Sequence, residues 1–217
     1  MEDHSYPMRI NKYMALKRYS TRRGADELIA KGKVFINGKK AVLGSKVEES
    51  DKVEVMTARN PVKYVYFAYH KPIGVITHSP KKDEMDIKQA ALLKDVAPLG
   101  RLDKNSHGLI ILTNDGRITD RLLNPKYAHD KEYVVTTSNK LRSSFKANME
   151  KGVDIEGYVT KKCKINILTD NKFEITLTEG KKHQIRRMCS NLFQEVSDLK
   201  RTRIMNCLLY TSPSPRD

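Results

Sequence analysis

The sequence has little cysteine and no long apolar run. Its three cysteines, Cys163, Cys189 and Cys207, are odd in number and show no C-x-x-C spacing. Neither a disulfide framework nor a zinc site is therefore indicated, and we expect reduced thiols. No apolar stretch approaches the ~18 residues that span a bilayer, and the first residues lack the basic-then-apolar order of a signal peptide. We expect a cytoplasmic protein that does not associate with membranes.

Motifs for cofactor chemistry are also missing. The chain contains neither a Walker loop nor a G-x-G-x-x-G fingerprint. Its histidines, cysteines and carboxylates do not cluster at metal-ligand spacing, so His78, His129 and His183 are interpreted as loop or hydrogen-bonding residues. We expect a protein that works without a cofactor or a metal.

Positive charge is what the chain has in excess. Its 217 residues include 41 Lys+Arg and 26 Asp+Glu, a formal net charge of +15, and 39% of them are hydrophobic. That apolar fraction suffices for a core without disulfides. Each Lys or Arg that meets a phosphate releases condensed counterions, so the surplus favours a nucleic-acid partner. The alternative is that the lysines only confer solubility.

Residues 1–60 predict a small module of two helices and a hairpin. Apolar positions over residues 8–30 fall into two helical pieces. Ser20 or Thr21 can cap the second helix and Gly32 can end it. Strands are predicted at Val34–Ile36 and Val53–Val55, and Asn37-Gly38 favours a type I′ turn after the first of them. The basic residues expected to contact RNA at this corner are Lys12, Arg22, Arg23 and Lys31.

Three segments of this module resemble the S4 RNA-binding domain. They are residues 9–13 (RINKY), 21–29 (TRRGADELI) and 32–39 (GKVFINGK). The resemblance implies that the module grips structured RNA.

A second domain is predicted over residues 61–206, after a short polar link with a boundary near Pro61. Its β-rich and helical runs alternate too irregularly for repeated βαβ units. The predicted fold class is therefore α+β, with a mixed, mainly antiparallel sheet and helices against it. Strands are predicted near residues 64–69, 108–113, 133–137, 162–167 and 173–177, and helices near 118–123, 141–149 and 184–192.

One loop of the second domain places a carboxylate between two basic side chains. Residues 99–116 (LGRLDKNSHGLIILTNDG) hold Asp103 between Arg101 and Lys104. From the local pattern alone, an Asp in such a turn is usually a capping or ion-paired residue. The full string, however, resembles the signature loop of the pseudouridine synthases. That resemblance implies that Asp103 is the catalytic carboxylate and that Arg101 and Lys104 contact RNA.

Two further segments resemble motifs of the same family, in the family's order. Residues 131–135 (KEYVV) resemble the motif whose Tyr, here Tyr133, stacks on the target base and is implicated in proton transfer. Residues 179–189 (EGKKHQIRRMC) resemble the motif whose basic residue, here Arg186, pairs with the catalytic Asp. In this motif Ile185 would line the base pocket and Arg187 would contact RNA. Taken singly, these would be an ordinary strand aromatic and a solvated helix start.

Residues 157–164 (GYVTKKCK) and 199–206 (LKRTRIMN) narrow the resemblance to the S4-domain-containing pseudouridine synthases of the RsuA/RluB/RluE/RluF group, nearest the RluF type. The resemblance implies a monomeric, cytoplasmic isomerase acting on a uridine of large-subunit (23S) ribosomal RNA, with tRNA as an additional substrate to test. The alternative is a non-catalytic rRNA-binding or ribosome-assembly factor.

The implied chemistry breaks the N1–C1′ bond of uridine and joins C5 to the same sugar carbon, without redox input. Asp103 could act as nucleophile, as base or by stabilising positive charge, and the sequence leaves these roles open. An arginine beside it would favour its ionised form. The target base must also be flipped out of its stack.

Residues 207–217 (CLLYTSPSPRD) do not continue the family pattern. They are interpreted either as the replacement of a missing natural C-terminus or as a genuine Ser/Pro tail.

Overall fold

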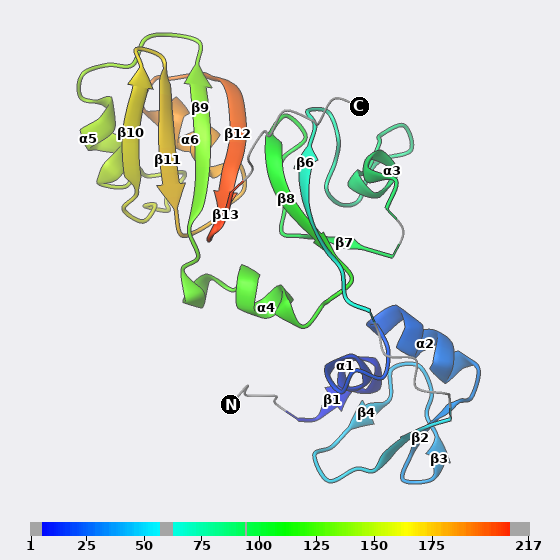
Figure 1. The fold of residues 1–217 in the computed structure, drawn as a ribbon. Helices are drawn as coiled ribbons and strands as arrows, with labels where there is room; N and C mark the ends of the chain where they lie inside the picture. The colour runs from blue at the N-terminus through cyan, green and yellow to red at the C-terminus, as the bar shows by residue number, and fades with distance from the viewer. Residues whose placement is uncertain (1–5, 57–62, 94, 209–217) are drawn as a thin grey trace. The chain divides into compact units, whose positions relative to one another are not determined.

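The computed structural model describes residues 6–56, 63–93 and 95–208, and the chain divides into two compact units (Figure 1). One unit comprises Met1–Val65 with Asn114–Thr119, and the other comprises Tyr66–Thr113 with Asp120–Asp217. The predicted boundary at Pro61 and nearly all of the predicted tail, residues 209–217, lie outside the described residues.

The first unit is a two-helix and hairpin module. In chain order its elements are β1 (Met8–Arg9), α1 (Ile10–Leu16), α2 (Arg22–Ala30), β2 (Val34–Ile36), β3 (Lys39–Lys40), β4 (Lys46–Val47) and β5 (Val53–Val55). Strand β2 lies between β3 and β5 with antiparallel pairing, and β1 pairs with β4. The core of the unit packs Ile10 and Met14 of α1 with Ala25 and Ile29 of α2 and Val34 of β2.

Local sequence signals explain the bounds of these elements. The Thr21 side chain caps α2 by accepting a hydrogen bond from the Gly24 N–H at 3.1 Å. Asn37 and Gly38 have φ angles of +51° and +76°, as a type I′ turn requires. The predicted cap, turn and two strands are confirmed.

The second unit is built on one mixed sheet. The remaining elements, of which α4 begins within the first unit, are β6 (Tyr66–Lys71), α3 (Ile87–Ala91), β7 (Ala97–Leu99), β8 (His107–Thr113), α4 (Ile118–Leu123), the 3₁₀ turn η1 (Pro125–Tyr127), β9 (Lys131–Thr137), α5 (Phe145–Glu150), β10 (Lys164–Thr169), β11 (Lys172–Leu177), α6 (Gln184–Asn191), β12 (Val196–Ile204) and β13 (Cys207–Leu208). The sheet order is β10-β11-β9-β12-β8-β6, with β13 on β12 and β7 on β8. Only the β8–β12 pair is parallel among the described strands, so the predicted mainly antiparallel sheet is confirmed.

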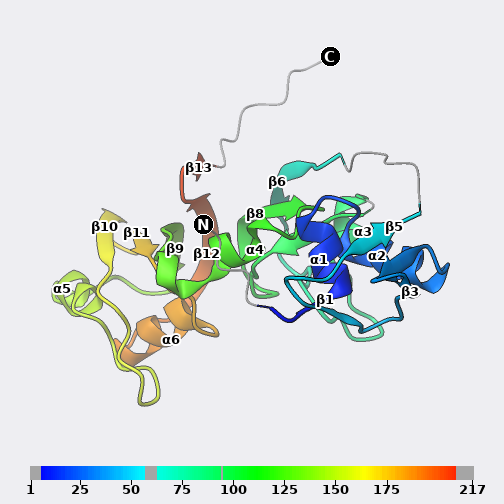
Figure 2. The same ribbon diagram turned by 90° about the horizontal axis from the view of Figure 1, so that it is seen from below.

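Helices α5 and α6 pack on the half of the sheet formed by β9 to β12 (Figures 1 and 2). Phe145 of α5 and Met188 of α6 are buried with Val135, Phe173 and other residues of one core cluster. This packing fixes α6, which carries the third predicted motif, against the strand that carries Tyr133.

The parallel pair β8–β12 determines which loops meet. Its register pairs Lys200 with His107 and Arg201 with Gly108. Gly108 has φ +104°, and a Cβ there would clash with the backbone carbonyl of Arg201, so only glycine permits this approach. Because the strands are parallel, the loop before β8 and the turn before β12 lie at the same end of the sheet.

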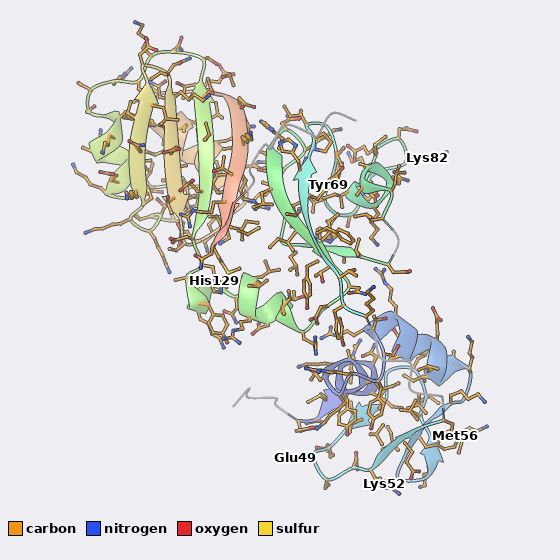
Figure 3. All side chains as sticks on the ribbon, viewed as in Figure 1. Glu49, Lys52, Met56, Tyr69, Lys82 and His129 are labelled. Atoms are coloured by element: carbon orange, nitrogen blue, oxygen red, sulfur yellow. The ribbon has the colours of Figure 1, made fainter. Side chains whose placement is uncertain are left out.

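Figure 3 draws the side chains on this framework, including Tyr69 on β6 and Lys52 just before β5. Lys52 pairs with Glu54 at 2.6 Å. In the ranges 6–56, 63–93 and 95–208, none of the helices combines the length and apolar character needed to cross a bilayer.

Candidate active site

Asp103 lies in the loop of residues 100–106 that connects β7 to β8. Its side chain is 37% exposed, so the carboxylate is open to a ligand. Its neighbours Arg101 and Lys104 are both exposed, and the Lys104 Nζ pairs with a Glu84 carboxylate oxygen at 2.9 Å.

The backbone of this loop is held by groups from several other parts of the chain. Every carbonyl from Arg101 to Asn105 accepts a hydrogen bond. In chain order the donors are Arg201 Nη1 at 3.3 Å, Thr77 Oγ1 at 2.7 Å, the Ser106 N–H at 3.0 Å, the Gly74 N–H at 2.8 Å with Lys71 Nζ at 3.5 Å, and Arg186 Nη2 at 2.9 Å. The loop that carries Asp103 is therefore preorganised.

Thr77 makes the most complete of these contacts. Its hydroxyl donates to the Leu102 carbonyl and also accepts from the Leu102 N–H at 3.2 Å. Both residues are buried, so no water replaces the hydroxyl if it is removed.

Lys71 is a fully buried ammonium beneath the loop. It donates to the carbonyls of Pro72 at 2.9 Å and Val75 at 2.7 Å as well as to the Lys104 carbonyl. Burial lowers the pKa of Lys71 to about 8, and the charge of Asp103 acts in the opposite direction. In sequence this residue only marks a turn before Pro72, and no local signal distinguishes it from a surface lysine.

Among the described residues, His183 is the side chain recorded in contact with the Asp103 carboxylate, and the two form an ion pair when the imidazole is protonated. Its Nε2 lies 3.4 Å from Asp103 Oδ1, and its side chain is 50% exposed. His183 precedes α6 with a left-handed φ of +51°. The family resemblance implies Arg186 as the partner, and here the contacts in the structure differ.

Arg186 donates to the carbonyls of Val196 at 3.0 Å and Asn105 at 2.9 Å, and an Arg186–Asp103 pair is not among the interactions of the described residues. Its guanidinium therefore joins the starts of β12 and α6 to the loop after Asp103. It positions the loop and does not pair with the carboxylate.

Arg201 lies close to both the Asp103 loop and the ring of Tyr133. Arg201 is 4% exposed, donates from Nε to the Leu109 carbonyl at 2.7 Å, and has its guanidinium 6.0 Å from the Tyr133 ring centroid. Tyr133 packs against the core cluster that contains Ile185, which is itself 5% exposed. Arg201 thus links the predicted stacking residue to the Asp103 loop. No local signal in the sequence marks Arg201 for this role, because an arginine in a basic protein resembles an RNA contact.

The remaining predicted RNA-binding residues lie elsewhere. Arg187 donates to the Ile155 carbonyl at 2.8 Å and pairs with Glu156 at 2.8 Å, so it holds a neighbouring turn against α6. In the first unit, Arg22 and Arg23 are exposed on the first turn of α2, Lys31 is exposed at its end and Lys12 is half-buried on α1. RNA contact by these five residues stays a prediction.

The described residues contain no group of three or more His, Cys, Asp or Glu that could hold a metal ion. A basic two-helix and hairpin module, followed by an α+β unit with an accessible carboxylate in a braced loop, fits the class of two-domain enzymes that act on RNA. Residues 65–191 match the RNA pseudouridylate synthase family, and residues 8–53 match the S4 domain. The chain belongs to the RNA pseudouridylate synthase family, and the resemblance seen in its sequence motifs is confirmed.

Relatives of known name cover nearly the whole chain. It is 41% identical over 212 residues to the dual-specificity RNA pseudouridine synthase RluF of Escherichia coli K12, with 95% of this chain and 73% of that protein covered. It is 35% identical to the ribosomal large subunit pseudouridine synthase B of Bacillus subtilis, with 89% and 84% covered. A crystal structure of a pseudouridylate synthase matches with a TM-score of 0.67 and 29% identity, covering 94% of this chain and 91% of the other.

Proposed function

We propose that this chain converts a specific uridine of large-subunit ribosomal RNA to pseudouridine, with Asp103 as the catalytic carboxylate. The observation that carries the proposal is the braced loop, in which every carbonyl from Arg101 to Asn105 is hydrogen-bonded while the Asp103 carboxylate projects half-exposed. A loop held so completely around one accessible carboxylate suits an enzyme better than an RNA-binding factor.

The reaction is an isomerisation within one nucleotide. The N1–C1′ bond breaks, the uracil rotates, C5 bonds to C1′, the proton on C5 leaves and N1 gains a proton. Atoms and electrons balance without an oxidant or a reductant, so the proposal needs no cofactor. Asp103 either attacks the sugar or stabilises the positive charge that develops there.

Three neighbouring side chains serve this carboxylate in different ways. We assign orientation of the Asp103 oxygens to His183, stacking on the flipped base to Tyr133, and positioning of the loop to Arg186. A Tyr133 hydroxyl or a water near it would accept the C5 proton. Ile185, beneath Tyr133 in the core, would support the pocket for the base.

The rest of the substrate is proposed to contact basic side chains of both units. Arg101 and Lys104 flank the carboxylate, and Arg22, Arg23 and Lys31 are exposed on the S4 domain. Their phosphate contacts would offset the cost of flipping the target uridine.

The names of the relatives support large-subunit rRNA as the substrate, and the dual-specificity relative supports tRNA as a second RNA to test. We propose that the protein acts as a monomer in the cytoplasm. We further propose that residues 1–60 form its RNA-binding domain and residues 61–206 its catalytic domain.

Tritium release tests the proposal directly. Large-subunit rRNA transcribed with [5-³H]uridine loses tritium to water when C5 bonds to the sugar. We expect release by the unaltered chain and none by Asp103→Ala, which should still retard the RNA in a gel. Binding without release by the unaltered chain would instead support the rRNA-binding or assembly factor.

A further inference from the structure

An exposed aromatic ring marks a second surface on the catalytic unit. Phe193 is 76% exposed and has a φ of +59°. A bulky L residue avoids this left-handed conformation, and glycine is the usual residue after a helix end. Leu92 shares both the exposure and the positive φ, so what sets Phe193 apart is its aromatic ring and the cation beside it.

The guanidinium of Arg142 lies 5.1 Å from the centroid of this ring. Arg142 precedes α5, and within the described part of the chain it has no ion-pair partner, nor has Lys146 on the first turn of that helix. An arginine without an ion-pair partner beside an aromatic ring, with a second such cation on the adjoining helix, suits an RNA strand, whose bases stack and whose phosphates need counter-charges.

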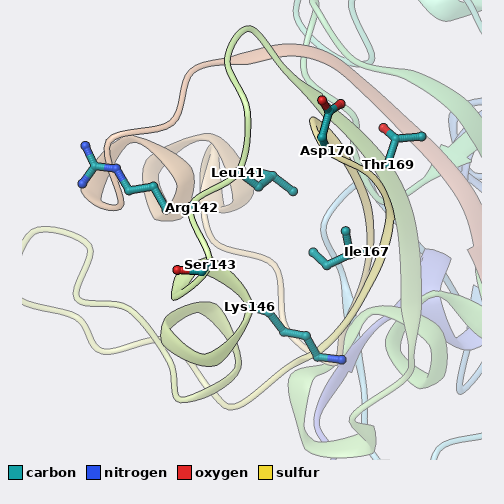
Figure 4. Close-up of a pocket in the computed structure, with 7 residues that line it drawn as sticks. All are labelled: Leu141, Arg142, Ser143, Lys146, Ile167, Thr169 and Asp170. Carbon is teal, nitrogen blue, oxygen red and sulfur yellow. The ribbon is translucent and has the colours of Figure 1, made fainter.

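A small pocket of about 190 Å³ adjoins Arg142 (Figure 4). Leu141 and Ile167 face into it, Lys146 reaches its rim, and Arg142 points away from it. Ser143, Thr169 and Asp170 complete the lining, and the Asp170 carboxylate is neutralised by Lys140 at 2.9 Å. Two apolar side chains with a cation at the rim fit a planar ring attached to a charged backbone. The volume is below that of ordinary small-molecule sites, so it suits a single base better than a larger ligand.

The position of this surface agrees with a role in substrate binding. Phe193 lies in the turn before β12, at the end of the sheet where the Asp103 loop precedes the parallel strand β8. Arg186 ties the two together, because it donates to both Asn105 and Val196. Ten residues separate His183 from Phe193, a span of roughly 15 Å along α6.

We propose that Phe193, Arg142, Lys146 and the Leu141–Ile167 pocket bind an unpaired nucleotide of the substrate RNA a few positions from the target uridine. A base stacks on the free face of Phe193 or enters the pocket, and the two cations contact the adjoining phosphates. This inference rests on RNA being the substrate, but not on the catalytic role of Asp103.

Phe193→Gly separates RNA binding from folding, because it removes the ring and also relieves the backbone strain. Its affinity for a labelled large-subunit rRNA transcript is measured in the Asp103→Asn background, where no turnover is expected, and turnover by that background is checked separately. We expect about tenfold weaker binding without a lower melting temperature, whereas Phe193→Tyr retains the affinity. Arg142→Gln should reduce the slope of log affinity against log salt by about 1.

Leu92→Gly is the matched control, because Leu92 is also exposed (88%) with a positive φ (+52°) but has no aromatic ring. It should leave RNA affinity unchanged. With Asp103 intact, Phe193→Gly should raise KM and leave kcat unchanged at saturating RNA. Unaltered affinity of Phe193→Gly, or an equal loss in Leu92→Gly, would overturn the proposal, and such a result leaves the isomerase assignment intact.

Discussion

The bracing of the Asp103 loop can be tested by removing a single hydroxyl group, that of Thr77. Thr77→Val keeps the shape of the side chain and removes the hydroxyl that bonds both the N–H and the carbonyl of Leu102. Each of these buried groups costs about 1–3 kcal/mol when it is left unsatisfied. After partial relaxation we expect the free energy of unfolding of the catalytic unit to fall by about 2–3 kcal/mol.

The loop should then lose its fixed position. A displacement of about 1 Å at a reacting group can cost up to about a hundredfold in rate. We expect kcat for tritium release to fall by about 10- to 100-fold, with KM changed less. Hydrogen exchange at the Leu102 amide, measured by mass spectrometry, should accelerate.

Thr160→Val is the control for general destabilisation. Thr160 is also buried, and its hydroxyl accepts from the Val153 N–H at 2.9 Å, away from the Asp103 loop. It should lower stability by about 1–2 kcal/mol and leave kcat unchanged. The reasoning is refuted if Thr77→Val retains full kcat despite losing stability, or if Thr160→Val loses activity equally.

Three further predictions follow from single residues. Phe193→Gly should raise the free energy of unfolding by about 1 kcal/mol because it relieves a left-handed φ, and urea unfolding that shows a loss would contradict this. His183→Asn tolerates the same backbone but removes the partner of Asp103, so kcat should fall about fivefold or less, as for a half-exposed pair; a hundredfold loss in tritium release would mean that His183 takes part in the chemistry. Burial lowers the pKa of Lys71 from 10.5 to about 8. Between these two pH values the unfolded chain therefore binds more protons than the folded chain. The free energy of unfolding, measured relative to that of Lys71→Met, should rise with pH from about 8 to 10.5 and stay level below about 8. Urea unfolding of both proteins from pH 7 to 10 measures this difference in free energy, and a difference that falls with pH or does not change would contradict the prediction.

Local elements of the first unit were predictable because their signals are local. The Thr21 cap, the Asn37-Gly38 turn and the strands Val34–Ile36 and Val53–Val55 each depend on residues within a few positions of one another. In the second unit α4 was predicted at its observed bounds, and α6 within one residue of them.

Strand β12 escaped prediction because its sequence, VSDLKRTRI, lacks apolar alternation. Two of its charged side chains, Asp198 and Arg201, have partners far away in sequence. Arg201 donates to carbonyls of Arg101 and Leu109, and His107 pairs with Asp198. Such partners are about a hundred residues away in sequence, so no local window contains them.

The candidate site shows the same division. The motifs single out Asp103 and Tyr133 as candidates, and their roles stay predictions, whereas the bracing of the loop by Thr77, Lys71 and Arg201 has no local signal in the sequence. A lysine or arginine that is buried and donates to backbone carbonyls is the same residue type as one that lies on the surface and contacts phosphate, so the sequence does not distinguish the two. The resemblance implies that Arg186 pairs with Asp103, whereas in the structure Arg186 reaches the loop backbone and His183 reaches the carboxylate.

Single-turnover tritium release by Asp103→Asn tests the central claim most directly. The variant keeps the size of the side chain and removes only its charge, and enzyme in excess over [5-³H]uridine rRNA makes the result independent of affinity. The account predicts release by the unaltered chain, none by the variant, and RNA affinity within about threefold of the original. Tritium release by Asp103→Asn at a rate comparable to that of the unaltered chain would contradict it.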